Sequence, residues 1–466
     1  MYRNFMLIFL FGLVTISSFA QPIVQPKLEK DVRASGVPGT VQFDLNGHLF
    51  GVNDVTWSPN GLKVATAGND STVRIWDATT GAILHTLRGH TRYNVRLVRW
   101  SPDGSKLSTA CFDSTARIWD VTTGALIATC KGHTDIDVYT VSWSPDGSKI
   151  VTSCRDSTAR IWDATTGKLL HNLVGHTSPY VIAASWSPNS EKIATSSYDK
   201  TTKIWDANAG TSTYTYAHYD YLTSVSWSPN GLKVAAGSLD RTARIWNVIP
   251  GITNYSLTGH KNAVYAVSWS PNSTKVATPS ADHTTKIWDV TTGELIHTLT
   301  GHTKGVTSAK WSPNGEKIAS SSEDSTIKIW DALTGRLLYT LTGHKEKVLT
   351  VDWSPDGSRV ATSSEDKTGN VKIWYITEPN AIQDVVPQAQ QTFSIVPNPT
   401  NATFTAQFQQ ETTLPTELRI CNLLGQSIST CIIPAGIKQW PVELSNVSAG
   451  MYIVTINSTA RSLIVY

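Results

Sequence analysis

Apolar and polar residues alternate in short runs along most of the chain, the pattern typical of half-buried β-strands. Residues 301–342 show the arrangement once in full. A Gly-His pair at His302 opens this stretch, and a first alternating run ends at Trp311. A second run ends at Asp324, and a third ends at Trp330. The stretch therefore predicts a unit of consecutive short β-strands.

The turns between these runs have their own chemistry. Ser-Pro-Asp-Gly at residues 101–104 and Ser-Pro-Asn-Gly at residues 58–61 follow the first run. Such sequences form tight turns because Pro fixes its φ angle and Gly tolerates positive φ. A Thr-Thr-Gly turn follows the third run, and a fourth, outer strand is expected at Leu337–Leu341. Each unit thus predicts four strands.

The unit recurs with a period of about 42 residues, which is within the range of four-stranded propeller blades. Three marks give the same register, and each counts eight units. The Gly-His mark has one degenerate copy, at Ala217-His218. Its histidines are His48, His90, His133, His176, His218, His260, His302 and His344. The tryptophans before Ser-Pro are Trp57, Trp100, Trp143, Trp186, Trp227, Trp269, Trp311 and Trp353. The tryptophans that close the third run are Trp76, Trp119, Trp162, Trp205, Trp246, Trp288, Trp330 and Trp374.

With these marks the chain resembles the WD-repeat β-propeller family over residues 41–376. The resemblance implies an all-β fold, an eight-bladed propeller. The eighth unit ends at Trp374-Tyr375 without an outer strand, while residues 41–46 alternate and precede the first Gly-His pair. We therefore expect residues 41–46 to complete the last blade, so that the ring closes and leaves fewer exposed strand edges. Residues 21–40 lack periodicity and are expected to form a mobile lead-in.

The carboxy-terminal part has a different pattern. Residues 377–391 have no hydrophobic period and are interpreted as a linker. Residues 392–466 contain seven short alternating runs separated by turns, which suggests a small β-sandwich. The opening Phe393–Pro399, the segment Asn422–Gln426 and the segment Leu444–Val454 are similar to the carboxy-terminal sorting domain of the Bacteroidetes type IX secretion system. That resemblance implies recognition by the type IX secretion machinery.

The amino terminus predicts export as well. Arg3 precedes the apolar run Phe5–Ile16, and small residues stand before Gln21, so residues 1–20 are interpreted as a secretory signal peptide. No other apolar run reaches the roughly 20 residues that a membrane span needs. We expect a secreted or cell-surface protein that crosses the inner membrane by the signal peptide and the outer membrane by the type IX system.

The net charge and the cysteine spacing argue against nucleic-acid and metal ligands. The net charge is +3 without a basic run, so nucleic acid is not an expected ligand. The five cysteines have wider spacing than zinc sites use, and we expect neither a metal nor a cofactor. Cys111 and Cys154 occupy equivalent positions in neighbouring units, so a disulfide is imaginable, but buried free thiols are the preferred interpretation.

Each unit contains His, Ser or Thr, Asp and Trp at fixed spacing; in the seventh these are His302, Ser320, Asp324 and Trp330. A catalytic Ser-His-Asp triad would occur once, whereas this set recurs in seven units. In the resembled family such a set is a structural hydrogen-bond network, and no catalytic residue is expected. The fifth unit has Ala236 where the hydroxyl belongs and should be the loosest. The eighth has two extra residues before Trp374, and its turn should protrude.

Function is therefore expected in positions that vary between units. Three positions per unit should line the rim of the channel on the face that carries the network His and Asp. Aromatic residues and arginines, which are common at binding hot spots, gather there in units two to six. The expected partner-binding residues are Arg96, Phe112, Tyr139, Arg155, Tyr180, Tyr198, Tyr221 and Tyr265.

This distribution predicts a non-enzymatic scaffold that binds a protein through the top face. A surface glycan is the alternative ligand. Large side chains that merely plug the channel are the structural alternative. An enzyme with a hydrolase or lyase site in the channel mouth, and a purely structural surface protein, also remain open.

Overall fold

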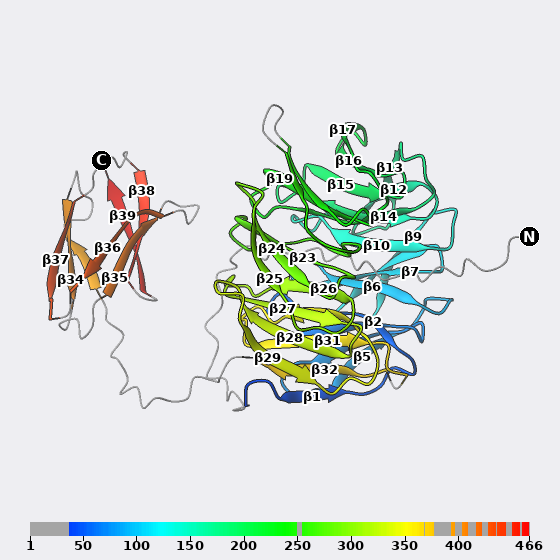
Figure 1. Cartoon of the computed structure of the whole chain (residues 1–466), viewed down its shortest axis with the longest axis horizontal. Coiled ribbons are helices and arrows are strands. Elements are labelled where there is room, and N and C mark those ends of the chain that lie inside the picture. Colours follow the sequence, from blue (N-terminus) through cyan, green and yellow to red (C-terminus); the bar gives the residue numbers. More distant parts are fainter. Residues whose placement is uncertain are drawn as a thin grey trace, which may run out of the picture. The chain divides into compact units, whose positions relative to one another are not determined.

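The computed structural model forms two compact units, Met1–Pro379 and Asn380–Tyr466, which are described separately. It describes residues 37–248, 254–367 and 369–376 of the first unit. In the second it describes residues 393–396, 403–408, 416–421, 427–434, 436–443, 450–456 and 459–465. All 39 elements in these ranges are strands, as the sequence predicts (Figure 1). The expected signal peptide, most of the lead-in and the linker at residues 377–391 lie outside the described residues.

The first unit is an eight-bladed propeller, and each blade is a four-stranded antiparallel sheet. The innermost strand comes first in each blade. Blades 1 to 4 contain β2 (Val52–Trp57), β3 (Lys63–Gly68), β4 (Val73–Asp77), β5 (Ile83–Leu87); β6 (Val95–Trp100), β7 (Lys106–Cys111), β8 (Thr115–Asp120), β9 (Leu126–Lys131); β10 (Val138–Trp143), β11 (Lys149–Cys154), β12 (Thr158–Asp163), β13 (Leu169–Val174); β14 (Val181–Trp186), β15 (Lys192–Ser197), β16 (Thr201–Asp206), β17 (Ser212–Ala217). Blades 5 to 8 contain β18 (Leu222–Trp227), β19 (Lys233–Ser238), β20 (Ala243–Asn247), β21 (Tyr255–Leu257); β22 (Ser268–Trp269), β23 (Lys275–Pro279), β24 (Thr285–Asp289), β25 (Leu295–Leu299); β26 (Val306–Trp311), β27 (Lys317–Ser322), β28 (Thr326–Asp331), β29 (Leu337–Thr342); β30 (Val348–Trp353), β31 (Arg359–Ser364), β32 (Val371–Tyr375) and β1 (Val41–Leu45).

The predicted ring closure is confirmed. β1 pairs antiparallel with β32, from Val41 opposite Trp374 to Leu45 opposite Val371, so the first strand of the chain completes the last blade (Figure 1). The Lys372 ammonium lies 2.7 Å from a carboxylate oxygen of Asp44 across this pair. The lead-in is ordered at its end, because the N–H of Gly39 donates to the Tyr375 carbonyl.

The core lies between blades. Aliphatic and Trp side chains of each sheet pack against the next, as when Ile75 and Leu87 of blade 1 meet Trp100 of blade 2. Six of the tryptophans before Ser-Pro also donate their indole N–H to a carbonyl on the inner strand of the preceding blade. Six of the eight blade interfaces therefore combine apolar burial with a directional bond from this tryptophan.

Blade 6 departs from the repeat at its inner edge. Its second strand carries Pro279, where the neighbouring blade 7 carries Ser321. Pro has no N–H to donate to the inner strand, so the ladder is interrupted there. β22 consequently spans two residues, whereas the other inner strands span six.

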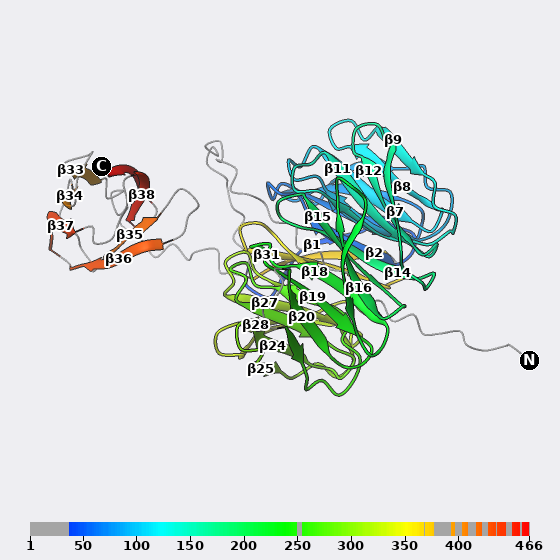
Figure 2. The ribbon, with the colours of Figure 1, turned by 90° about the horizontal axis from the view of Figure 1, so that it is seen from above.

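The second unit contains the seven predicted strands in two sheets. One has the order β33 (Phe393–Val396), β34 (Thr403–Phe408), β37 (Gln439–Glu443). The other has the order β36 (Ser427–Ile433), β35 (Thr416–Cys421), β38 (Gly450–Ile456), β39 (Thr459–Val465), drawn in orange and red in Figure 2. Ala406, Leu418, Ile420 and Ile433 are buried in this unit. The seven-stranded all-β tail is confirmed, and its packing as a sandwich stays a prediction.

Candidate binding surface

The recurring His, hydroxyl, Asp and Trp residues form a buried chain of hydrogen bonds. In blade 7 the Trp330 indole N–H donates to the Ser320 Oγ over 2.8 Å. The same Oγ lies 2.8 Å from His302 Nε2, and His302 Nδ1 lies 2.9 Å from Asp324 Oδ2. The backbone N–H of Thr303 donates to the same carboxylate. The network thus satisfies polar groups within the blade and ties its top loop to the neighbouring turn.

The electrostatics of the network fit a structural role. Burial alone would raise the pKa of Asp324, but the hydrogen bonds from His302 and Thr326 lower it well below its usual range. Burial lowers the pKa of His90 in blade 2, against the opposing effect of Asp113. An ionised Asp therefore holds a neutral His, whose two ring nitrogens are both engaged in hydrogen bonds.

Blade 5 lacks this chain, as predicted. Ala236 offers no hydroxyl, and within the described residues both ring nitrogens of His218 lack a hydrogen-bond partner. His218 Nδ1 lies 3.8 Å from Asp240. The centroids of His218 and Trp246 are 4.9 Å apart, against 5.9–6.5 Å for the equivalent pairs in blades 2, 3, 4, 6, 7 and 8. The rings have closed over the space that the hydroxyl fills elsewhere.

The extra residues of blade 8 were expected to protrude, and at Gly369 that expectation is wrong. Gly369 has φ of +64°, and a Cβ there would lie 2.3 Å from the His48 carbonyl oxygen. Only Gly permits so close an approach. This part of the turn therefore folds back onto blade 1.

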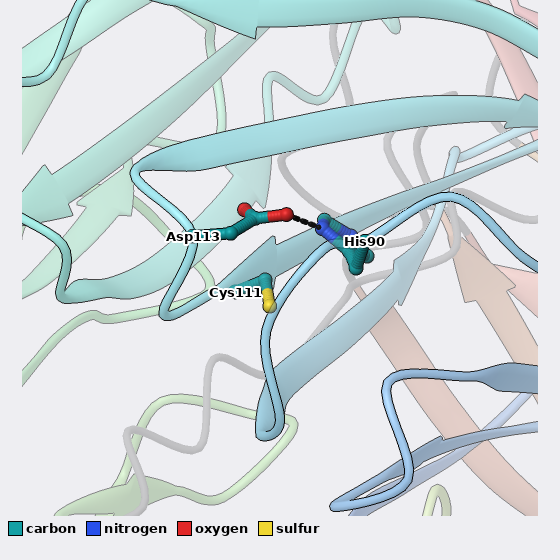
Figure 3. Close-up of side chains that lie close together, drawn as sticks. All are labelled: His90, Cys111 and Asp113. Carbon is teal, nitrogen blue, oxygen red and sulfur yellow. Dashed lines mark hydrogen bonds and ion pairs between the residues drawn. The ribbon is translucent and has the colours of Figure 1, made fainter.

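Two groups of His, Cys and Asp lie close enough to suggest a metal site. They are His90, Cys111 and Asp113 (Figure 3) and the equivalent trio in blade 3. However, burial raises the pKa of the Cys111 thiol to about 12, which opposes the thiolate that a metal needs. Cys111 bonds the Arg92 carbonyl as Ser322 bonds the Lys304 carbonyl in blade 7. The cysteine therefore replaces a structural serine. Cys111, Cys130 and Cys154 are free and buried, as preferred from the sequence.

A β-bulge places one of the expected binding positions at the channel. The pairing of the inner strand with its neighbour skips one residue in seven blades. In blades 2 and 3 the skipped residue is Arg96 and Tyr139. A bulge residue is left out of the hydrogen-bonded pairing between strands, so its side chain can point in a different direction from those of its neighbours.

Seven of the eight expected binding residues come together. The Arg96 guanidinium lies 5.7 Å from the ring centroid of Phe112 and 5.5 Å from that of Tyr139. These two rings meet edge to face at 6.1 Å. Arg96 also influences the pKa of Tyr198, although burial dominates and raises it, so blades 2 and 4 approach each other here.

The remaining rings form a stack with cations at both ends. Tyr198 lies 5.1 Å from Tyr180 and 4.7 Å from Tyr221, with interplanar angles of 31° and 8°. The Arg155 guanidinium lies 5.1 Å from the Tyr180 centroid, and the Lys200 ammonium lies 5.7 Å from that of Tyr221. We call Phe112, Tyr139, Tyr180, Tyr198 and Tyr221, together with Arg96, Arg155 and Lys200, the aromatic ladder.

Tyr265 stands apart from the ladder. It is 3% exposed, and the ring contacts found among the described residues do not include it. Burial, with a contribution from Glu323, raises its pKa. Tyr265 thus lies near Glu323 of blade 7 and outside the aromatic ladder.

The phenols of the aromatic ladder are suited to hydrogen bonding. Burial raises the pKa of Tyr139 and of Tyr198, so both phenols stay neutral and can donate or accept hydrogen bonds. Arg155 forms an ion pair with Asp137 at 3.3 Å. Cation–π contacts and stacked rings hold the side chains in place, which reduces the entropy lost when a ligand binds.

A second polar cluster lies on the inner strands of blades 7, 8, 1 and 2. Asp54 is ion-paired with Arg99, and Asp352 accepts the N–H of Trp57 over 2.9 Å. Burial raises the pKa of both aspartates and lowers the pKa of Lys310 to about 8, against the effect of Asp352. Two acids and two bases balance each other across the blade 8–blade 1 boundary. The cluster therefore places opposite charges on neighbouring inner strands where the ring closes.

The sequence interpretation missed several exposed apolar residues on the same face. Leu49, Phe50, Tyr93, Ile136 and Tyr219 lie in the loops that follow the network histidines, not at the three rim positions. The signal was present in the sequence, since these loops are apolar in some units and rich in lysine in others.

Family profiles match both the repeated part of the chain and its carboxy-terminal part. The profile of the family "WD domain, G-beta repeat" matches eight times, at residues 39–77, 81–120, 124–163, 167–206, 210–247, 251–289, 293–331 and 335–374. The profile "Secretion system C-terminal sorting domain" matches residues 394–465. In the described residues, we find no helix that is long and apolar enough to cross a membrane.

Similar curated proteins match over about one repeat. "Nuclear distribution protein nudF" of Aspergillus flavus is 41% identical over 59 residues, 13% of this chain and 13% of that protein. "Protein TOPLESS" of Arabidopsis thaliana is 46% identical over 50 residues, 10% of this chain and 4% of that protein. The chain thus spans a small fraction of the length of these relatives.

Proposed function

We propose that this chain, which belongs to the WD domain, G-beta repeat family, is an exported, non-enzymatic scaffold that binds a protein partner through the aromatic ladder on its top face. Propellers of this family typically serve as protein-interaction scaffolds, and the sorting tail implies export. In this proposal a signal peptide and the type IX machinery carry the chain across the two membranes, and the propeller then meets its partner outside.

The observation that carries the proposal is the cation-capped stack. Tyr180 and Tyr198 belong to blade 4 and Tyr221 to blade 5, and their contacts differ from those of the repeated network. Tyr221 is 42% exposed, and Arg155 keeps 40% of its side chain accessible. Aromatic and Arg side chains with restricted rotamers are the typical anchors of protein interfaces.

A surface glycan is the alternative ligand. Sugar rings stack on an open aromatic face, whereas both faces of Tyr198 are covered by neighbouring tyrosines. The edges and hydroxyl groups of the stack suit a polypeptide better. The protein partner is therefore the preferred ligand.

The test is capture of partners from the surface and medium of the producing cells with the native chain and with the Tyr180→Ala/Tyr198→Ala chain. The proposal expects a protein that the native chain retains and the variant loses. The matched control is Tyr214→Ala, which alters an outer-strand tyrosine that stacks with Tyr216 away from the ladder. Equal capture by all three chains would contradict the proposal, and loss of a glycan alone would favour the alternative.

A further inference from the structure

Five exposed apolar side chains extend the top face beyond the ladder. Their exposed fractions are 71% for Leu49, 49% for Phe50, 74% for Tyr93, 41% for Ile136 and 80% for Tyr219. They come from blades 1, 2, 3 and 5, and Tyr180 of the ladder occupies the loop of blade 4. We call these five residues the apolar arc.

The loops of the apolar arc are held in place by the network. The backbone N–H of Leu49 donates to Asp70 over 3.0 Å, and that of Tyr219 donates to Asp240 over 3.4 Å. The rings of Phe50 and Tyr93 meet edge to face at 6.2 Å. The arc is thus presented to solvent by anchored loops, although burial of these side chains would be favourable.

The same loops carry lysine in the other three blades. Lys261, Lys304 and Lys345 are exposed, and we call them the lysine arc. The N–H groups of Lys261 and Lys345 bond the network aspartates as Leu49 and Tyr219 do. The acids nearby are the exposed Glu346, Glu323 of blade 7, and Glu365, which pairs with Lys347 at 3.3 Å.

The fold does not require this division. All eight loops make the same backbone bond to the network aspartate, and the residue that donates it is exposed in each. Other exposed apolar residues, such as Leu126, Leu169 and Leu337, recur at one position of the outer strands and belong to the repeat. The two arcs differ from blade to blade, as expected of a surface shaped by a ligand.

We propose that the two arcs form one docking surface for a segment of a partner protein that carries apolar residues followed by a run of Asp and Glu. The apolar part packs on blades 1 to 5 beside the ladder, and the acidic part lies over the lysines of blades 6 to 8. This inference rests on the proposed function, since it names the kind of protein segment that the top face would bind. Charge complementarity gives the segment its orientation.

The test uses the full chain on an array of synthetic 12-residue peptides. One set has an apolar half and an acidic half, a second replaces the acidic half by lysines, and a third replaces the apolar half by serine. The acidic–apolar set should bind best. Phe50→Ser/Tyr93→Ser should weaken its binding about tenfold, whereas Leu333→Ser, which removes an equally exposed side chain elsewhere, should not.

Charge reversal gives the second readout. Lys304→Glu should reduce the preference for acidic over basic peptides, while Lys168→Glu, on an exposed turn of blade 3, should leave it unchanged. Equal binding of acidic and basic sets, unchanged binding by the Phe50/Tyr93 variant, or no binding of any acidic–apolar peptide would overturn the inference.

The ladder variant separates the two proposals. If Tyr180→Ala/Tyr198→Ala loses peptide binding while both arc variants bind as the native chain does, the arcs are wrong and the proposed function stands. If the arc variants lose binding while the ladder variant keeps it, the docking surface stands and the ladder assignment is wrong.

Discussion

The boundary between blades 8 and 1 and the middle of the ring at blades 5 and 6 differ in the bonding that holds their strands and blades together. The boundary joins distant parts of the chain, and an arginine bridges it at the position where blade 5 has a lysine. Arg359 of blade 8 donates to the Ala78 carbonyl of blade 1 over 2.7 Å and lies 4.6 Å from the Trp57 ring centroid. Lys233 of blade 5 makes the equivalent bond, to the Val290 carbonyl of blade 6 over 2.9 Å, but the boundary also has the bond from the Trp57 N–H to Asp352.

The middle of the ring is covalently continuous but has weaker secondary bonding. Blade 5 has no network hydroxyl, its outer strand β21 spans three residues, and β22 of blade 6 spans two. The indole N–H of Trp227 in blade 5 lacks an acceptor among the described residues, as does that of Trp57 at the boundary. Trp57, however, has the Arg359 guanidinium over its ring. The comparison indicates that the bonding is stronger where the ring closes than in blades 5 and 6. We therefore expect the ring to open first at blades 5 and 6.

Removal of the closing strand should have the largest effect. Deleting residues 21–46 exposes the edge of β32 and removes buried Leu45 and the Lys372–Asp44 pair. We expect the melting temperature to fall by about 5–10 °C or more. Differential scanning calorimetry of the chain measures it, with deletion of residues 21–36 as the control. An unchanged melting temperature would contradict the conclusion that β1 holds the last blade closed.

Acid should weaken the ring next. Burial lowers the pKa of His48, His90 and His133 despite their aspartates, so the folded protein keeps them neutral while the unfolded chain protonates near pH 6.5. The stability linked to neutral His is fully present above about pH 6.5 and is lost as the pH falls toward the lower folded value. The lowered pKa of Asp113 adds a loss below about pH 4. Melting curves should agree at neutral and alkaline pH and shift to lower temperature by about pH 5; a flat profile contradicts this.

The reinforcement at the boundary should be measurable by itself. Arg359→Ala removes the bonds to blade 1 and the contact with Trp57, at a cost of about 1–2 kcal/mol in the free energy of unfolding. Urea denaturation measures this cost. Lys233→Ala, at the equivalent position in blade 5, is the matched control and removes a bond to the Val290 carbonyl and a contact with Tyr255. It should cost less, because the Lys233 ammonium bonds one carbonyl of the next blade where the Arg359 guanidinium bonds two. Equal costs would mean that the boundary has no special reinforcement.

Repair of blade 5 should have the smallest effect and the opposite sign. Ala236→Ser supplies the missing Oγ, as Ser320 does in blade 7, and should stabilise the chain by about 1 kcal/mol. His218 must first move away from Trp246, which limits the gain. In the same urea assay, Ser320→Ala should destabilise by about 1–3 kcal/mol. If Ala236→Ser destabilised the chain, the packing of His218 and Trp246 around Ala236 would leave no room for a hydroxyl.

The sequence predicts the features that repetition fixes. Seven complete copies of His, hydroxyl, Asp and Trp, and an eighth without the hydroxyl, establish blade number, strand order and the network. The eighth unit lacks an outer strand of its own and so reveals the role of β1. Repetition does not determine which rim side chains meet, because the rim positions are the ones that vary between units. Tyr198 therefore stacks on Tyr221 of the next blade, while Tyr265 is buried beside Glu323. The shortened β22 and the inward fold at Gly369 depend on a single Pro and a single close approach.

Native-state hydrogen exchange followed by mass spectrometry tests the central comparison most directly. Equivalent third strands provide the fair measure, namely β20 in blade 5 and β32 in blade 8. Amides that open with the least free energy exchange first. We predict that β20 and the adjoining β23 lose protection before β32 and β1. Earlier exchange of β32 and β1 would place the weakest point where the chain closes and would contradict the account.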